Sequence, residues 1–170
     1  MEFTRWTIGP TLAAYLRELL RPGMRTLECG SGLSTEIFLQ SGCDHIALEN
    51  DPRYAFNDQC VVMTRLTGQP PWYAVWPRGP FDVILIDGPA AANGGRWGFM
   101  RVAGELLGQN TIVIVDDVQR NDEKALAEAI AKAFGLSPLV IPARLPLDYG
   151  RRACVLRPNG VVKSAKIGYL

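Results

Sequence analysis

Short apolar runs alternate along the chain with amphipathic stretches, and this alternation predicts strands that alternate with helices. The clearest run, 81–86, lies between Gly79-Pro80 and Asp87-Gly88-Pro89, as is typical of a strand buried on both faces. The predicted strands are 24–29, 44–48, 72–76, 81–86, 111–115, 139–141 and 153–156. The predicted helices run from Pro10 to before Pro22, over 33–40, over 53–65, through Met100, Ala103, Leu106 and Leu107, and from the N-cap Asn121 to Gly135.

Alternating strands and helices predict an α/β domain with a mostly parallel sheet and helices on both faces. A chain of 170 residues is typical of one domain, which we divide into an N-terminal helix (1–23), an α/β core (24–158) and a tail (159–170). Only residues 77–80 separate the predicted third and fourth strands. We therefore expect no helix between those two strands.

Composition narrows the classes of partner. A net charge of +1 gives no basic surface for nucleic acid or for an acidic membrane, so neither is expected as a partner. The N-terminal stretch matches neither a signal peptide nor a membrane span. Four scattered cysteines without metal-binding spacing indicate reduced thiols, and hence a cytoplasmic protein. The oligomeric state, including a homodimer, stays open.

The segment 27–35 is the candidate binding loop, because an apolar run ends at Glu28 and two glycines follow immediately. Gly30 and Gly32 permit backbone angles closed to other residues and leave no side chain between backbone and ligand. The helix predicted to start at Leu33 would direct free N–H groups towards the loop. This pattern predicts a cradle for the charged end of a nucleotide-like cofactor.

Two common cofactor loops fit poorly. A phosphate-binding P-loop needs a Gly-Lys-Ser/Thr that is absent here, and a dinucleotide loop needs a third glycine where Thr35 stands. The form Glu-x-Gly-x-Gly-x-Ser-Thr resembles instead the first motif of class I S-adenosylmethionine-dependent methyltransferases. That resemblance spans about 24–118 and implies a Rossmann-like, seven-stranded sheet whose final strand inserts antiparallel, with S-adenosylmethionine (SAM) as the cofactor.

Acidic residues follow four of the predicted strands, at Glu28, Glu49, Asp87 and Asp116-Asp117. Glu49 lies 17 residues beyond Gly32, where a carboxylate would accept both ribose hydroxyls; a solvated loop acid or a helix cap is the alternative. The resemblance implies that Glu28 binds the methionine amino group, and that Ser34 and Thr35 serve its carboxylate unless they act only as caps. The expected cofactor-binding set is Glu28, Gly30, Ser31, Gly32, Ser34, Thr35, Glu49, Asn50 and Asp87.

The blocks 81–89 and 112–117 resemble the later motifs of small-molecule O-methyltransferases. Methyltransferases that act on nucleic-acid amino groups carry Asp/Asn-Pro-Pro-aromatic after the fourth strand, whereas this chain has Asp87-Gly88-Pro89-Ala90. The resemblance therefore implies methyl transfer to an oxygen of a small-molecule acceptor. A non-catalytic SAM-binding module and an NAD-dependent oxidoreductase are the alternative functions.

The single histidine, His45, opens an apolar run, so we expect it at the sheet edge opposite the loop, with a structural role. Acid–base chemistry then falls to carboxylates, and Asp87 and Asp116 are the expected catalytic residues. Catechol O-methyltransferase-like enzymes hold magnesium at equivalent strand ends. The resemblance thus implies a Mg²⁺ site at Asp87, Asp116 and Asp117. Neutralisation of these acids by Arg96, Arg101 and Arg120 is the alternative.

Overall fold

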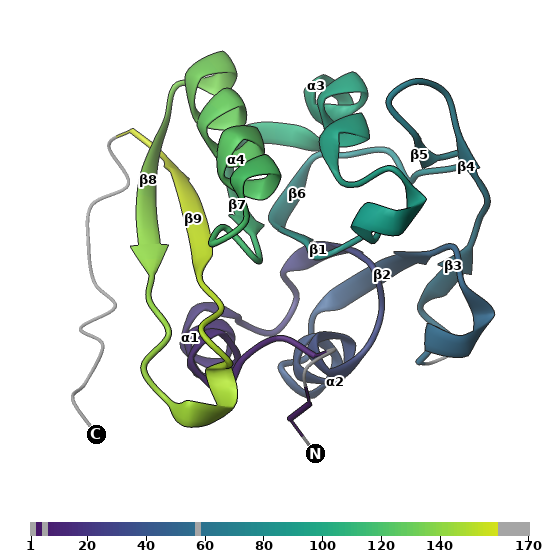
Figure 1. Cartoon of the computed structure of the whole chain (residues 1–170). Helices are drawn as coiled ribbons and strands as arrows, with labels where there is room; N and C mark the ends of the chain where they lie inside the picture. Colours follow the sequence, from purple (N-terminus) through teal and green to yellow (C-terminus); the bar gives the residue numbers. More distant parts are fainter. Residues whose placement is uncertain (1–2, 5–6, 57–58, 160–170) are drawn as a thin grey trace.

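The structure, a computed structural model, describes residues 3–4, 7–56 and 59–159 and has helices on both faces of a central sheet (Figure 1). The strands of that sheet are β1 (Arg25–Cys29), β2 (Asp44–Glu49), β3 (Val61–Met63), β6 (Phe81–Ile86), β7 (Leu107–Val115), β8 (Leu136–Ile141) and β9 (Ala153–Pro158). A separate hairpin consists of β4 (Leu66–Thr67) and β5 (Trp72–Tyr73). The α-helices are α1 (Pro10–Leu19), α2 (Leu33–Gln40), α3 (Ala103–Leu106) and α4 (Asn121–Phe134).

The sheet has seven strands in the order β3-β2-β1-β6-β7-β9-β8. The strands from β3 to β7 pair in parallel, and β9 inserts antiparallel between β7 and β8. This topology confirms the predicted Rossmann-like sheet with its antiparallel final strand. Chain order reverses between β1 and β6, and ligands in such sheets bind outside the carboxyl ends of the strands at that point.

Two apolar layers form the core, because successive side chains on each strand point to opposite faces of the sheet. Ile84 and Ile86 of β6 pack on the α3 and α4 side, whereas Val83 and Leu85 pack on the α1 and α2 side. The same alternation directs Glu28 of β1 towards α2. The sheet therefore determines which of the predicted site residues face each other.

The predicted helix over 53–65 is wrong. Of the described residues after β2, Pro52–Tyr54 form a 3₁₀ turn and Val61–Met63 form the short strand β3; residues 57–58 of the predicted helix lie outside the described part. The Asp51 side chain accepts the Arg53 N–H at 3.0 Å and closes the turn, and the backbone is already extended at Ala55. The β-branched residues Val61 and Val62 pair with β2 instead of continuing a helix.

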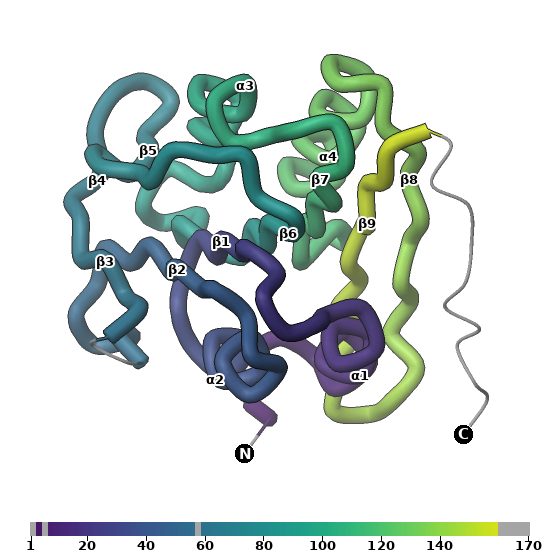
Figure 2. Tube along the Cα trace, turned by 180° about the vertical axis from the view of Figure 1, so that it is seen from behind, coloured from purple at the N-terminus to yellow at the C-terminus, as the bar shows by residue number. Residues whose placement is uncertain are grey.

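The predicted third strand over 72–76 is also wrong. Trp72–Tyr73 pairs with Leu66–Thr67 as a hairpin outside the main sheet, beside α3 in both Figure 1 and Figure 2. Trp72 is buried against Phe99, with ring centroids 5.7 Å apart, so apolar packing and not sheet pairing explains its sequence pattern. The hairpin thus lies within the segment 64–80, which joins β3 to β6, and that segment contains no helix, as expected between the third and fourth strands of the sheet.

Two helix limits differ from the prediction. The segment before β7 divides into a 3₁₀ turn (Trp97–Arg101) and the single-turn helix α3, and Leu107 already belongs to β7. Helix α4 is capped by Arg120 rather than by Asn121, which is its first residue. Its end at Gly135, with φ +64°, is as predicted.

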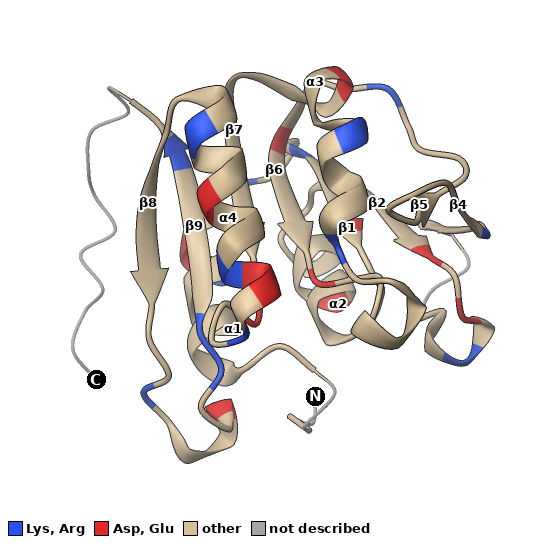
Figure 3. Cartoon of the chain, turned by 45° about the horizontal axis from the view of Figure 1, so that its top comes forward, with Lys and Arg blue, Asp and Glu red and all other residues tan. Residues whose placement is uncertain are grey.

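Among the described residues, no helix combines the length and apolarity that a membrane crossing needs. Acidic and basic residues are interspersed along α4 (Figure 3). The tail residues 160–170 lie outside the described part of the chain.

Candidate functional site

A cavity of about 200 Å³ opens at the carboxyl ends of β1, β2 and β6, where the topology places a ligand. It brings together five of the predicted cofactor-binding residues, which are Gly30, Ser31, Glu49, Asn50 and Asp87. Gly32, Ser34, Thr35 and Glu28 are not among its lining residues. Further lining residues outside the predicted cofactor-binding set are Asp51, Tyr54, Tyr73, Gly88, Pro89, Ala90, Asn93 and Arg151; Arg96, Asp117 and Arg120 complete the wall.

Gly30 and Gly88 form the floor of this cavity through a close approach of two backbones. Gly30 has φ +96°, and the N–H groups of Asp87 and Gly88 both donate to the Cys29 carbonyl, at 3.0 and 2.5 Å. A Cβ added to Gly88 would lie 3.1 Å from the Gly30 Cα and N. A side chain at Gly88 would therefore collide with the Gly30 backbone. A side chain at Gly30 would sit on a left-handed backbone that favours glycine.

Glu49 ends β2 and turns its carboxylate back towards the loop. Its Oε2 accepts the Ser31 N–H at 3.0 Å, and Oε1 accepts the N–H groups of Asn50 and Asp51 at 2.6 and 2.8 Å. The side chain thus fastens the glycine loop to β2. Only one of these bonds reaches Oε2, so that oxygen keeps a free lone pair for a further donor in the cavity.

Glu28 points the other way, into the layer beneath the loop. Its carboxylate accepts hydrogen bonds from the hydroxyl groups of Ser34 and Thr35, the latter at 2.6 Å, and is 1% exposed. His45 Nε2 lies 3.5 Å from Glu28 Oε2, and His45 stacks on Phe38 with ring centroids 4.4 Å apart. His45 is the second residue of β2 and pairs with Thr26, so it lies at the sheet edge opposite the loop as expected, and its buried ring reaches from there towards Glu28.

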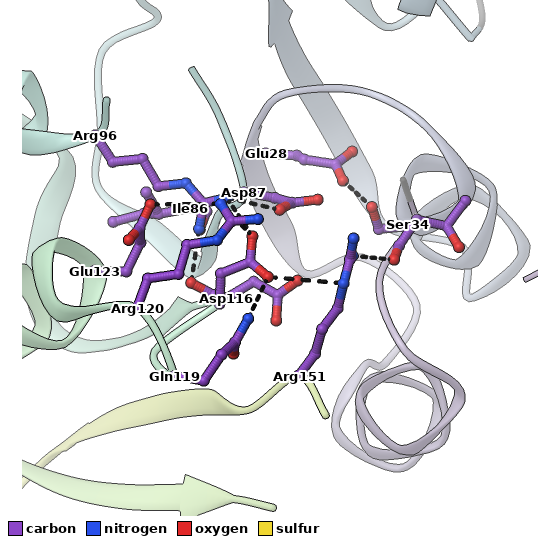
Figure 4. A network of polar contacts seen from close by, with 12 residues as sticks. Glu28, Ser34, Ile86, Asp87, Arg96, Asp116, Gln119, Arg120, Glu123 and Arg151 are labelled. Atoms are coloured by element: carbon purple, nitrogen blue, oxygen red, sulfur yellow. Dashed lines mark hydrogen bonds and ion pairs between the residues drawn. The ribbon is translucent and has the colours of Figure 1, made fainter. Parts of the chain in front are cut away.

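Asp87, Asp116 and Asp117 gather at the ends of β6 and β7 with three arginines around them (Figure 4). Arg96 Nη2 donates to Asp87 Oδ1 at 3.1 Å and to Asp117 Oδ2 at 3.0 Å, and Arg96 Nη1 donates to the Asp116 carbonyl at 2.6 Å. Arg120 and Arg151 approach Asp117 at 3.1 and 3.7 Å. Arg96 and Arg120 thus neutralise Asp87 and Asp117, whereas Arg96 contacts Asp116 through its backbone carbonyl.

Arg101, the third arginine expected at this edge, lies elsewhere. Its Nη1 donates to the carbonyls of Thr67 and Pro70, at 3.0 and 3.3 Å, and so fastens the β4–β5 hairpin to the 3₁₀ turn that carries it. The expectation for Arg101 was wrong because it assumed a continuous helix over this segment.

The three carboxyl groups differ in acidity. Burial raises the pKa of Asp116 to about 8, and its neighbours Asp87 and Asp117 add to that shift. Burial likewise raises the pKa of Asp87 to about 6, against the lowering effect of Arg96. Burial alone would raise the pKa of Asp117, but Arg96, the Gln119 hydrogen bond and the other two arginines lower it.

The same three acids have the spacing of a cation site. One oxygen from each lies within 4.8 Å of the others, and Asp116 Oδ2 is buried without a hydrogen-bond partner in the described part of the chain. Asp117 adopts a left-handed backbone, with φ +62°. Arg96 Nη2 already bridges two members of the triad, so a metal and this guanidinium would compete for the same oxygens.

Tyr73 is the lining residue with the weakest signal in the sequence. It belongs to the segment misread as a sheet strand, and nothing in its local pattern places its hydroxyl beside Gly30 and Gly88. Arg151 comes from the loop before β9, far from the recognised motifs. Tyr54, from the turn after β2, was likewise hidden by the predicted helix.

Several known structures have a fold similar to that of this chain. The chain resembles an O-methyltransferase from Bacillus cereus in complex with S-adenosylhomocysteine (SAH), at 18% identity over 91% of this chain and 84% of that one, with a TM-score of 0.62. A SAM-dependent methyltransferase from Aquifex aeolicus gives 12% identity, coverage of 88% and 89%, and a TM-score of 0.56. An Aeropyrum pernix fibrillarin with natively bound SAM gives 16% identity, coverage of 85% and 73%, and a TM-score of 0.54. No family model and no curated protein sequence matches the chain. The resemblance predicted from the loop motif is confirmed in the fold, which is that of SAM-dependent methyltransferases.

Proposed function

We propose that this protein, whose fold is that of SAM-dependent methyltransferases, binds SAM in the cavity above Gly30 and transfers its methyl group to an oxygen of a small molecule. The observation that carries the proposal is the combination of the Gly30–Gly88 floor with Glu49 at the end of the neighbouring strand, in one cavity at the switch point of the sheet. The O-methyltransferase similarity of the chain supports the choice of oxygen.

The cavity residues fit the parts of this cofactor. Glu49 Oε2 would accept a ribose hydroxyl, and the glycine floor would allow the backbone to approach the ligand closely. Ser31, Asn50 and Asp87 would contribute the remaining contacts on the cavity wall. Glu28, Ser34 and Thr35 would support the loop from beneath, since their polar groups bond to one another.

When bound, SAM would supply a methyl group that its sulfonium centre already activates. The protein then has to align the acceptor and remove a proton from it. Asp87 lines the cavity, and its pKa of about 6 suits a general base near neutral pH. Asp116, with a pKa of about 8, keeps its proton at neutral pH and so leaves Asp87 as the proton acceptor.

A second proposal concerns Mg²⁺ at Asp87, Asp116 and Asp117. The unpartnered Asp116 Oδ2 and the 4.8 Å spacing support it, and oxygen ligands are those that Mg²⁺ prefers. We expect a saturable calorimetric response to MgCl₂ that Asp116→Asn abolishes. If the wild-type protein gives no response and excess chelator leaves SAH binding unchanged, the acids interact with the arginines and do not bind a metal.

Calorimetric titration with SAM, SAH and NAD tests the proposed function against its alternatives. We expect binding of SAM and SAH and no response to NAD. Binding of NAD alone would favour the oxidoreductase. A non-catalytic module would bind SAM and SAH but would leave the methyl group of labelled SAM in place with every hydroxylated acceptor offered.

A further inference from the structure

The Tyr73 hydroxyl is a buried polar group without a hydrogen-bond partner among the described residues. Tyr73 is 1% exposed, and it reaches the cavity from the β4–β5 hairpin rather than from the sheet. A buried hydroxyl that bonds to nothing costs free energy, and native structures rarely keep one without a reason. The position therefore needs an explanation beyond packing.

The surroundings of this hydroxyl point to a ligand. A Cβ added to Gly88 would lie 2.8 Å from the Tyr73 oxygen, which places the hydroxyl directly at the glycine floor. Burial raises the pKa of Tyr73, and Cys29, Glu49 and Asp87 act in the same direction against the lowering effect of the Gly30 backbone, so the group remains a proton donor. Its ring is fixed against Trp72, with centroids 5.1 Å apart at 74°. A fixed donor thus lies in the wall of the cavity, next to the glycine floor.

We propose that Tyr73 is a cofactor-binding residue whose hydroxyl donates a hydrogen bond to an oxygen of the bound cofactor. This inference rests on the proposed function, because it assigns one contact within the same cavity. The acceptor chemistry is an oxygen lone pair, which SAM offers both on its ribose and on its amino-acid carboxylate. The acids beside Tyr73 accept hydrogen bonds, so the hydroxyl supplies a side-chain donor on this wall of the cavity.

The substitution Tyr73→Phe tests this inference, because it removes the hydroxyl and keeps the ring. Without ligand, we expect the variant to unfold at the same temperature as the wild type or a higher one, since a buried unpaired group has been removed. With SAH, we expect affinity to fall about tenfold, the equivalent of about 1.4 kcal/mol. Tyr149→Phe is the matched control: Tyr149 is 44% exposed and is not among the residues that line the cavity, and we expect the SAH affinity of this variant to be unchanged.

Methylthioadenosine, which lacks the amino-acid carboxylate, identifies the acceptor oxygen. If Tyr73→Phe weakens methylthioadenosine binding as much as SAH binding, the acceptor oxygen is on the ribose. If the substitution weakens only SAH binding, the acceptor oxygen belongs to the carboxylate. Equal SAH affinity in Tyr73→Phe and wild type would overturn the inference, and so would a variant that loses stability without ligand. Failure of the wild type itself to bind SAH would instead refute the proposed function.

Discussion

Gly30 and Gly88 come from the ends of different strands, yet a Cβ added to Gly88 would lie 3.1 Å from both the Cα and the N of Gly30. The contact joins the loop after β1 to the loop after β6 across the switch point of the sheet. The site therefore depends on two glycines, of which only Gly30 was expected to bind the cofactor.

Substitution of Gly30 should affect both folding and binding. Gly30→Ala places a Cβ on a backbone with φ +96°, which we expect to cost about 1–2 kcal/mol of unfolding free energy and to lower SAH affinity at least about tenfold. Gly32→Ala is the matched control, because its φ of 163° is extended and a Cβ there meets nothing within 4 Å. Thermal unfolding and calorimetry measure both effects. Equal losses in the two variants would show that the loop acts through overall stability.

Loss of the Glu49 carboxylate should weaken cofactor binding, because the ribose of the cofactor loses its hydrogen-bond acceptor. Glu49→Gln keeps the size of the side chain, and we expect it to lower SAH affinity by about 1.5–3 kcal/mol, the range for hydrogen bonds to a charged group. An SAH analogue without ribose hydroxyls should bind the variant and the wild type about equally in the same titration. A remaining difference with that analogue would assign Glu49 to loop structure alone, through Ser31, Asn50 and Asp51.

Asp116 should make the fold less stable as pH rises. Its pKa is raised to about 8 in the folded chain, so the unfolded chain releases this proton more readily. The group therefore stabilises the fold fully below its unfolded pKa of about 4, and this contribution is lost as pH rises towards 8. We expect Asp116→Asn to gain at least about 1.4 kcal/mol in unfolding free energy, relative to wild type, between pH 5 and pH 9. Parallel pH profiles of urea unfolding would contradict this account.

Asp148 should matter for stability and not for the site. It lies in the loop between β8 and β9, where its carboxylate accepts the N–H groups of Thr11, Arg144 and Leu145 at 2.9, 2.8 and 2.7 Å, and the Thr11 hydroxyl at 2.5 Å. Asp148→Ala leaves these donors unpaired, and we expect a loss of about 2–3 kcal/mol in unfolding free energy. SAH affinity should stay unchanged in the folded variant, and a parallel loss of affinity would show that α1 and the site are coupled.

Long apolar runs made the central sheet predictable from the sequence. The strand 81–86 and its neighbours bury both faces, and so their patterns have one interpretation. The segment 53–80 was misread because its strand β3 has three residues and its buried aromatic residues pack in a hairpin. Periodicity cannot distinguish these cases from a helix and a sheet strand.

The part of the candidate site that lies at the strand ends was also predictable from the sequence. Strand ends of a parallel sheet meet at one edge, which brought Gly30, Glu49 and Asp87 together as expected. The direction of Glu28 was not predictable from the motif, because it depends on the hydroxyl groups of Ser34 and Thr35 beneath the loop. Tyr73 reaches the cavity only through the hairpin, a tertiary arrangement without a local signal.

A crystal structure of the protein grown with saturating SAH tests the central claim most directly. We predict SAH in the cavity above Gly30, with its ribose hydroxyls within hydrogen-bond distance of Glu49 and its sulfur on the side of Asp87. SAH bound at any other place on the chain, or a cavity that stays without SAH at saturating concentration, would contradict the account.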